Sequence, residues 1–191
     1  MSTVLSLPEE LIRDVLSYFL VVDEQSFCVF PNSGYLSKRR SAGDTRNPWP
    51  RTSVLLVSKQ WLRIGTPLLY EKVVLHGTAE TRAVAELVKA DATVGRAMKY
   101  LRLEGGMGKD LVTIAKHAPN IHTLWITPHV RPSESITGLK KIITLLQPRK
   151  LYYLLRAHSR RGNKTGDEIQ KLIVPCIARS WTSLVGILLR I

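Results

Sequence analysis

The 191-residue chain has few cysteines, few acidic residues and no long apolar run. Its two cysteines, Cys28 and Cys176, lie far apart, so we expect two unpaired thiols rather than a disulfide framework. No apolar run approaches the roughly 18 residues of a membrane-spanning helix. No basic start precedes an apolar stretch, as it would in a secretory signal. These absences predict an intracellular protein, cytoplasmic or nuclear, with no membrane partner.

The sequence also lacks the motifs of common catalytic and metal sites. No histidine stands at metal-ligand spacing from another histidine or a cysteine, and there is no Gly-x-Ser-x-Gly elbow. The glycine-rich residues 105–110 match neither the phosphate loop nor the dinucleotide fingerprint, so we interpret them as a strand-to-helix turn. We therefore expect no enzyme, no catalytic residues, no metal and no cofactor.

Positive charge is abundant and unevenly distributed. The chain has 28 basic and 15 acidic residues, a net charge of +13, and residues 149–191 hold nine basic and two acidic residues, a net of +7. Such a surface attracts acidic proteins, nucleic acid or anionic lipid without selecting among them. The basic runs at 38–40 and 156–164 fit a nucleic-acid contact, an import signal or an acidic partner, but solvated loops are the simpler interpretation.

The first 70 residues predict a small helical region interrupted by a loop. Apolar residues recur at helical spacing over residues 8–20, after a capping Ser6 and Pro8, and we expect Leu11, Val15, Leu16 and Leu55 in the core. Turn-forming and charged residues fill an insertion at about 21–51. A second helix is predicted from residue 52 to about 64, where Gly65, Thr66 and Pro67 end it.

From residue 70 onward a short apolar pattern repeats: apolar, two spacers, apolar, one spacer, apolar. Its predicted central positions are Val73, Leu101, Leu124, Leu154 and Ile187. Helix-like stretches lie between them at about 79–90, 109–117, 135–146 and 166–179. Strand-plus-helix units at such steps are typical of a degenerate leucine-rich repeat, although an ordinary α/β domain with a small parallel sheet also fits.

The last predicted strand lies at the very end of the sequence, with no capping element after it. We expect an open sheet edge there. Either a partner covers this edge or the chain is part of a longer protein.

Two segments of the N-terminal region carry a family resemblance. Leu7-Pro8-Glu9-Glu10 begins the first, and Val57-Ser58-Lys59-Gln60-Trp61 forms the centre of the second, which continues to Leu68-Leu69-Tyr70. Together they resemble the F-box, with its Leu-Pro-x-Glu start, its Val-Cys/Ser-Lys-x-Trp centre and its Leu-Tyr end. The resemblance covers about residues 4–75, and the insertion at 21–51 resembles that of fungal F-box proteins.

The resemblance implies a fold and a function. It implies a mixed α/β protein: a helical F-box at 4–75, then a short leucine-rich-repeat-like array of parallel strands and helices at 71–191. F-box proteins dock on a Skp-type adaptor and through it on a cullin scaffold, and their downstream domain binds the target for ubiquitin-dependent degradation. The residues that match adaptor-contacting positions are Leu7, Pro8, Ile12, Leu16, Val57, Lys59 and Trp61.

The alternative is a basic nucleic-acid-associated protein that uses the C-terminal Lys/Arg-rich segment. The two hypotheses differ in their response to salt, since phosphate contacts weaken steeply as salt rises and apolar docking does not.

Overall fold

A computed structural model describes residues 7–28, 51–105, 107–127, 135–154 and 164–190. The chain divides into two compact units, Met1–Leu69 and Tyr70–Ile191, called here the N-terminal unit and the C-terminal unit. Most of the predicted insertion, residues 29–50, lies outside the described residues, as do residues 38–40 and 156–163 of the two basic runs.

Helices build the described part of the N-terminal unit. They are α1 (Glu9–Leu20), α2 (Glu24–Cys28), the 3₁₀ helix η1 (Arg51–Leu56) and α4 (Lys59–Leu69). The helix predicted over 8–20 is confirmed: α1 follows Pro8 and carries Glu9 and Glu10 in its first turn, where the helix dipole favours acidic side chains. Helices α1, η1 and α4 pack around a core of five buried residues, Ile12, Leu16, Leu20, Leu55 and Leu68.

The single helix predicted from residue 52 to about 64 is wrong in both bounds. The 3₁₀ helix ends at Leu56, and α4 starts at Lys59 after Ser58, whose Oγ accepts a hydrogen bond of 3.1 Å from the Trp61 amide. Helix α4 then continues through Gly65 and Pro67. An added Cβ at Gly65 would lie 2.3 Å from Leu55 Cδ2, so this glycine permits close packing instead of ending the helix.

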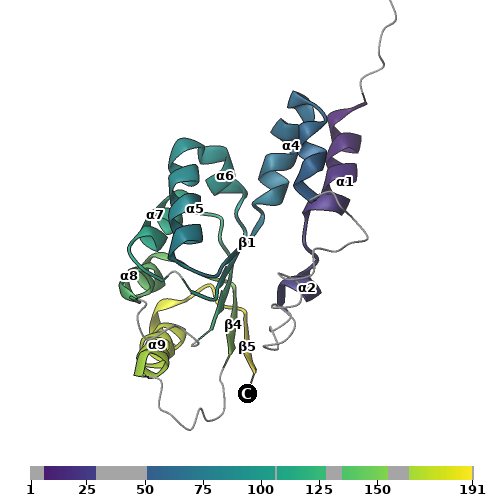
Figure 1. Cartoon of the computed structure of the whole chain (residues 1–191). Coiled ribbons are helices and arrows are strands. Elements are labelled where there is room, and N and C mark those ends of the chain that lie inside the picture. Colours follow the sequence, from purple (N-terminus) through teal and green to yellow (C-terminus); the bar gives the residue numbers. More distant parts are fainter. Residues whose placement is uncertain (1–6, 29–50, 106, 128–134, 155–163, 191) are drawn as a thin grey trace, which may run out of the picture. The chain divides into compact units, whose positions relative to one another are not determined.

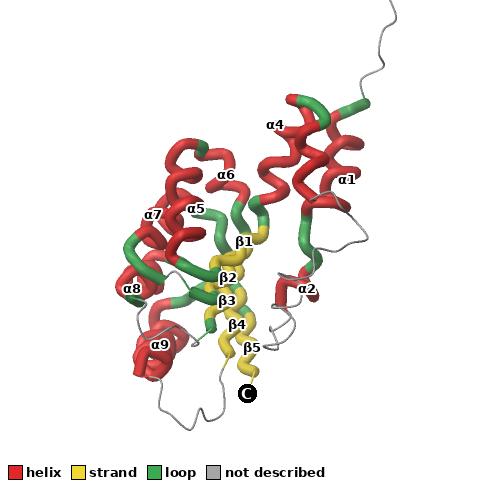
Figure 2. Tube along the Cα trace, in the orientation of Figure 1, coloured by secondary structure: helices red, strands yellow, loops and turns green. Residues whose placement is uncertain are grey.

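The C-terminal unit is a parallel sheet with helices on one side (Figures 1 and 2). The strands are β1 (Lys72–Leu75), β2 (Tyr100–Leu103), β3 (Thr123–Ile126), β4 (Lys150–Leu154) and β5 (Gly186–Arg190), and they pair in chain order. The helices are α5 (Thr78–Ala90), α6 (Ala92–Ala97), α7 (Asp110–His117), α8 (Thr137–Leu145) and α9 (Lys164–Pro175), and α9 runs into a π-helical turn, Cys176–Ser180. The predicted mixed α/β class is therefore confirmed.

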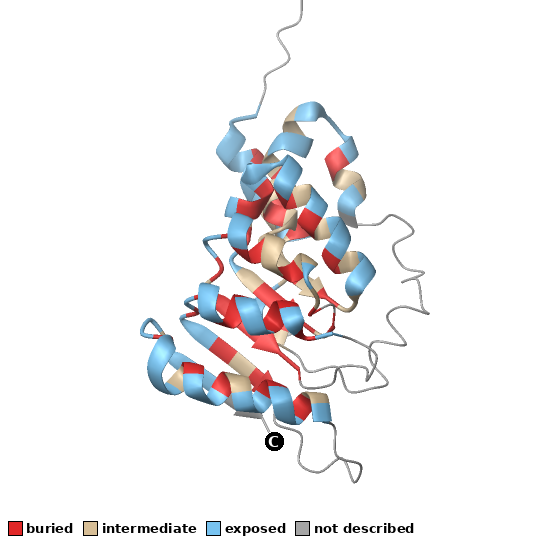
Figure 3. Cartoon of the chain, turned by 90° about the vertical axis from the view of Figure 1, so that its left-hand side faces the viewer, coloured by how far each residue is buried: buried red, intermediate tan, exposed pale blue. Residues whose placement is uncertain are grey.

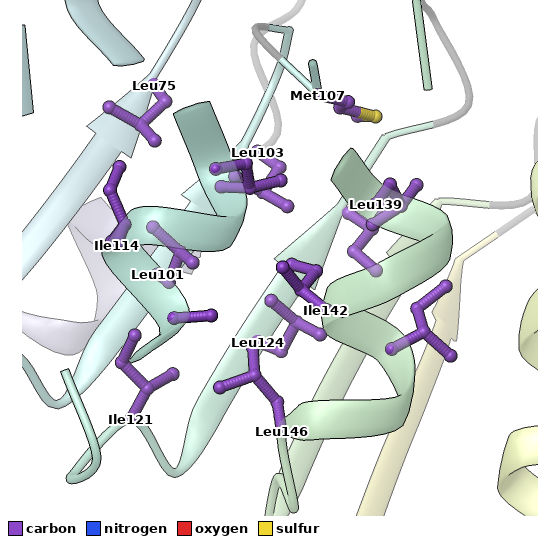
Figure 4. Packing of buried hydrophobic residues seen from close by; sticks show 14 of the residues in the cluster. Leu75, Leu101, Leu103, Met107, Ile114, Ile121, Leu124, Leu139, Ile142 and Leu146 are labelled. Carbon is purple, nitrogen blue, oxygen red and sulfur yellow. The ribbon is translucent and has the colours of Figure 1, made fainter. Parts of the chain in front are cut away.

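Two rows of side chains on the inner face of the sheet meet the helices. One row is Val73, Leu101, Leu124, Leu151 and Ile187, and the next contains Leu75, Leu103, Ile126 and Tyr153. All of these except Ile187 belong to one buried cluster with residues from the helices, such as Ile114, Leu139 and Ile142 (Figure 4). Figure 3 looks onto the helix layer, where exposed positions dominate the outer surface. Burial of one face per element thus makes a continuous core along the sheet.

The repeat pattern is right at four strands and wrong at one. Val73, Leu101, Leu124 and Ile187 occupy one row as predicted, but Leu151, not Leu154, pairs with Leu124 and Ile187. Around β4, the apolar pattern therefore begins three residues earlier than predicted, at the buried Pro148, and ends at Tyr153. Proline and tyrosine both fill apolar positions here, which a pattern of aliphatic residues misses.

A backbone contact fixes the start of α8 against the turn before α7. The Leu139 amide donates to the Met107 carbonyl over 3.1 Å, and a Cβ added at Gly138 would lie 1.7 Å from the Gly108 carbonyl oxygen. Only a residue without a side chain fits at position 138, because its neighbour is backbone and cannot rotate away.

We expect Gly138→Ala to lower the free energy of unfolding by roughly 2 to 3 kcal/mol, because the methyl group forces α8 away from this turn. Gly108→Ala is the control, since an added Cβ there meets nothing within 4 Å. Urea unfolding of both full-length variants measures the difference. A Gly138→Ala protein as stable as the control would contradict this contact.

Candidate partner-binding surface

Helix α1 carries two apolar stripes, one buried and one exposed. Ile12, Leu16 and Leu20 face the core of the N-terminal unit. The exposed stripe, called the α1 stripe, consists of Leu11, Val15, Tyr18 and Phe19, with exposures of 51%, 45%, 86% and 48%. At 3.6 residues per turn these four side chains share an arc of about 100° beside the buried one.

Further large apolar side chains are exposed elsewhere in the N-terminal unit. They are Leu7, Leu56, Val57 and Leu62, with exposures of 55%, 85%, 64% and 49%. The described part of the unit thus exposes more large apolar residues than it buries in its core. Exposed apolar surface of this extent is typical of interaction sites, and a domain this small buries little apolar area by itself.

The seven predicted adaptor-contacting residues divide into two groups. Leu7, Pro8, Val57 and Lys59 are exposed, at the starts of α1 and α4 and in the connection before α4. Ile12 and Leu16 are 3% and 0% exposed, and the half-buried Trp61 packs against the same core. The last three residues support the unit from inside, while the first four lie at its surface.

The sequence interpretation placed Leu11 and Val15 in the core, and this is wrong. Both lie on the α1 stripe, while Leu16 and Leu55 are buried as predicted. The sequence does hold the signal: apolar residues between 11 and 20 cover more than half of the helix circumference. One packed neighbour buries a narrower arc than that, so part of the apolar surface had to remain exposed.

An exposed ion pair joins α1 and α4 in the N-terminal unit. Arg63 of α4 forms an ion pair with Glu9 at the start of α1, but the two side chains are 64% and 52% exposed. Solvent screening leaves such a pair with a small effect on stability. Apolar packing between α1, η1 and α4 therefore sets the shape of the surface that carries the α1 stripe.

The titratable groups with shifted pKa values lie in the C-terminal unit. Burial, with a smaller effect of Asp167, raises the pKa of Tyr153 to about 12, and burial raises the pKa of the Cys176 thiol. Both groups stay protonated at neutral pH, so neither is an activated nucleophile. The described residues contain no group of three or more His, Cys, Asp or Glu placed to hold a metal. None of the helices described has the length and apolar composition needed to cross a bilayer.

His122 lies among positive charges at the start of β3. Burial is the largest cause of its lowered pKa, and Arg149, Lys99 and Lys150 lower the pKa further, while Glu71 opposes them. The unfolded chain therefore takes up a proton at His122 before the folded chain does. As pH falls through about 6.5 toward the pKa of His122 in the folded chain, protonation of His122 therefore lowers the free energy of unfolding.

Comparison with protein-family models, with curated proteins and with solved structures finds no match to this chain. The F-box resemblance therefore depends on the motif residues of the sequence.

A pair of leucine truncations on α1 tests which stripe is structural. We expect Leu16→Ala to reduce the local stability of α1 by about 3 kcal/mol, because it opens a cavity in a five-residue core. Leu11→Ala, the same chemical change on the exposed stripe, is expected to cost less than about 1 kcal/mol. Native-state hydrogen exchange of the α1 amides in the full chain measures both. Equal losses in the two variants would contradict the two-stripe description.

The positive charges around His122 lead to a prediction about its pKa. Arg149→Gln is expected to raise the pKa of His122 toward its ordinary value of about 6.5, because one of the nearby positive charges is removed. NMR titration of the imidazole protons measures this pKa. Lys141→Gln, an exposed charge removal on α8, is the control and should leave the titration unchanged. A lowered or constant value in Arg149→Gln would contradict the assigned cause.

Proposed function

We propose that the protein is a substrate-recognition adaptor of a Skp–cullin–F-box ubiquitin ligase. Its N-terminal unit docks on a Skp-type adaptor, and its C-terminal unit binds a target protein. The observation that carries this proposal is the α1 stripe: an exposed apolar surface on a helix whose adjacent apolar side already forms the core.

The positions of the F-box motif residues support the docking role. The Leu-Pro start leads directly into α1, and the Ser58-Lys59 step begins α4, so both motif segments open helices that pack on one another. Leu7 and Val57 are exposed at these starts, close in sequence to the Pro8 and Lys59 surface positions. An apolar helix surface of this kind is suited to packing against helices of a partner.

The division into units supports a separate target-binding role for the remainder. Residues 70–191 have their own core and their own sheet. The N-terminal unit can therefore dock on the adaptor while the C-terminal unit binds the target. The pairing of the strands in chain order, each followed by helices on one side, supports the proposal of a leucine-rich-repeat-like array, a kind of structure that binds other proteins.

Calorimetric titration of the full chain with a Skp-type adaptor tests the docking role. We expect the wild type to bind and the double variant Leu11→Ser/Val15→Ser to lose roughly tenfold or more in affinity, because two apolar contacts are removed. Arg13→Ser is the control, since Arg13 lies on the other side of α1 from the stripe.

Salt dependence separates docking from charge-driven association. The adaptor affinity of the wild type is expected to change little between low and moderate salt, because apolar burial carries it. If the folded wild type does not bind the adaptor, or if the double variant binds as well as Arg13→Ser, the proposed function is wrong.

A further inference from the structure

The parallel register gathers basic side chains at one end of the sheet. Backbone hydrogen bonds continue the pairing one residue before the strands: the His122 amide donates to the Lys99 carbonyl over 3.0 Å, and the Arg149 amide to the His122 carbonyl over 2.7 Å. Residues 99, 122 and 149 therefore lie on neighbouring strands, about 4.8 Å apart from one strand to the next. The sequence separates them by more than twenty residues each time.

The next row across the sheet adds further positive charge. Lys72, Tyr100, Thr123, Lys150 and Gly186 are paired in register. Along each strand these residues alternate with those of the inner rows, so their side chains lie on the sheet face opposite the helices. The Lys72 Nζ lies 4.8 Å from the Tyr100 ring, and Tyr100 contacts the His122 ring edge-on. Together, Lys72, Lys99, His122, Arg149 and Lys150 form what we call the basic row.

Three cations of the basic row act on His122. Within the row, Lys99 forms an ion pair with Glu71 over 3.4 Å. The pKa of His122 is lowered first by burial and then by the charges of Arg149, Lys99 and Lys150. Arg149 and Lys150 are exposed, so an anionic group can approach this part of the row from solvent.

An open cavity, called the β4–β5 cavity, lies at the end of the basic row, beside the paired starts of β4 and β5. Its volume is about 340 Å³, and it is lined by Lys150, Leu151, Tyr152, Val185, Gly186 and Ile187. An added Cβ at Gly186 meets nothing within 4 Å, so the missing side chain leaves open space beside Lys150, its register partner. Val185 and Ile187 are 87% and 42% exposed, which gives the cavity an accessible apolar wall.

We propose that the basic row and the β4–β5 cavity bind an acidic segment of a partner protein, with one bulky apolar side chain of that segment inserted in the cavity. The carboxylates of the segment lie on Arg149 and Lys150, and the apolar side chain takes the space that Gly186 leaves. Charge complementarity selects an anionic partner, and the mostly apolar lining selects an aliphatic or aromatic side chain over the polar edges of a nucleobase. This site is independent of adaptor docking by the N-terminal unit.

A pool of short synthetic peptides tests the proposal on the full chain. Asp or Glu fills every flanking position of the pool, and the central position is randomised over apolar and polar residues. Sequencing of the bound fraction is expected to show enrichment of large apolar residues at the centre. Gly186→Leu fills the cavity and should remove that enrichment, with a loss of roughly tenfold or more in affinity for the selected peptide.

Two matched controls separate the site from general effects. Gly77→Leu makes the same change at a glycine with extended backbone and open space around its Cβ, away from the cavity, and should keep the enrichment. Arg149→Glu should weaken the selected peptide roughly fivefold or more, while Lys141→Glu, an equal charge reversal on α8, should leave its affinity unchanged.

The proposal is overturned if no apolar residue is enriched, or if enrichment survives Gly186→Leu. It is also overturned if a mixed-sequence single-stranded oligonucleotide binds more tightly than the selected peptide and loses affinity in Arg149→Glu, because the basic row is then a nucleic-acid site. Adaptor titration of the same Gly186→Leu protein should remain at the wild-type affinity, so failure here is distinguishable from failure of the docking role.

Discussion

The in-register parallel pairing of five strands in chain order is the constraint on which most of the structure depends. Because each strand lies beside the one before it, every connecting helix returns on the same side of the sheet (Figure 2). The alternating side chains then divide into inner rows that meet the helices and outer rows that do not. The single core of the C-terminal unit and its helix layer both follow from this pairing.

The same pairing explains features that have no local cause. Gly138 has to be glycine because α8 starts against the backbone of the turn before α7. This contact joins segments at the starts of two consecutive helices of the C-terminal unit. The basic row exists because Lys99, His122 and Arg149 each precede a strand, and the strands begin at the same end of the sheet. The β4–β5 cavity has Lys150 and Gly186 in its lining because these two residues, far apart in the sequence, are register partners.

The N-terminal unit follows a different rule. Its helices have more apolar surface than their mutual packing buries, so α1 divides its apolar residues between a core stripe and an exposed stripe. Gly65 brings α4 close enough to α1 and η1 to close that small core. Packing of this kind gives a helical unit whose exposed side is suited to further apolar contact, which is the basis of the proposed adaptor role.

Apolar periodicity by itself determined most elements: α1, β1, β2, β3, β5 and the helices α5, α7, α8 and α9 lie about where the spacing of apolar residues predicts them, whereas the short helix α6 was not predicted. Such periodicity is local, since a helix or strand must repeat its buried positions within one segment. Tertiary structure alone decided which residues of α1 face the core, that Leu151 rather than Leu154 enters the fourth row, and that Gly65 and Pro67 lie inside α4. It also brought the basic row together, because that choice depends on neighbours in space that the order of residues does not specify.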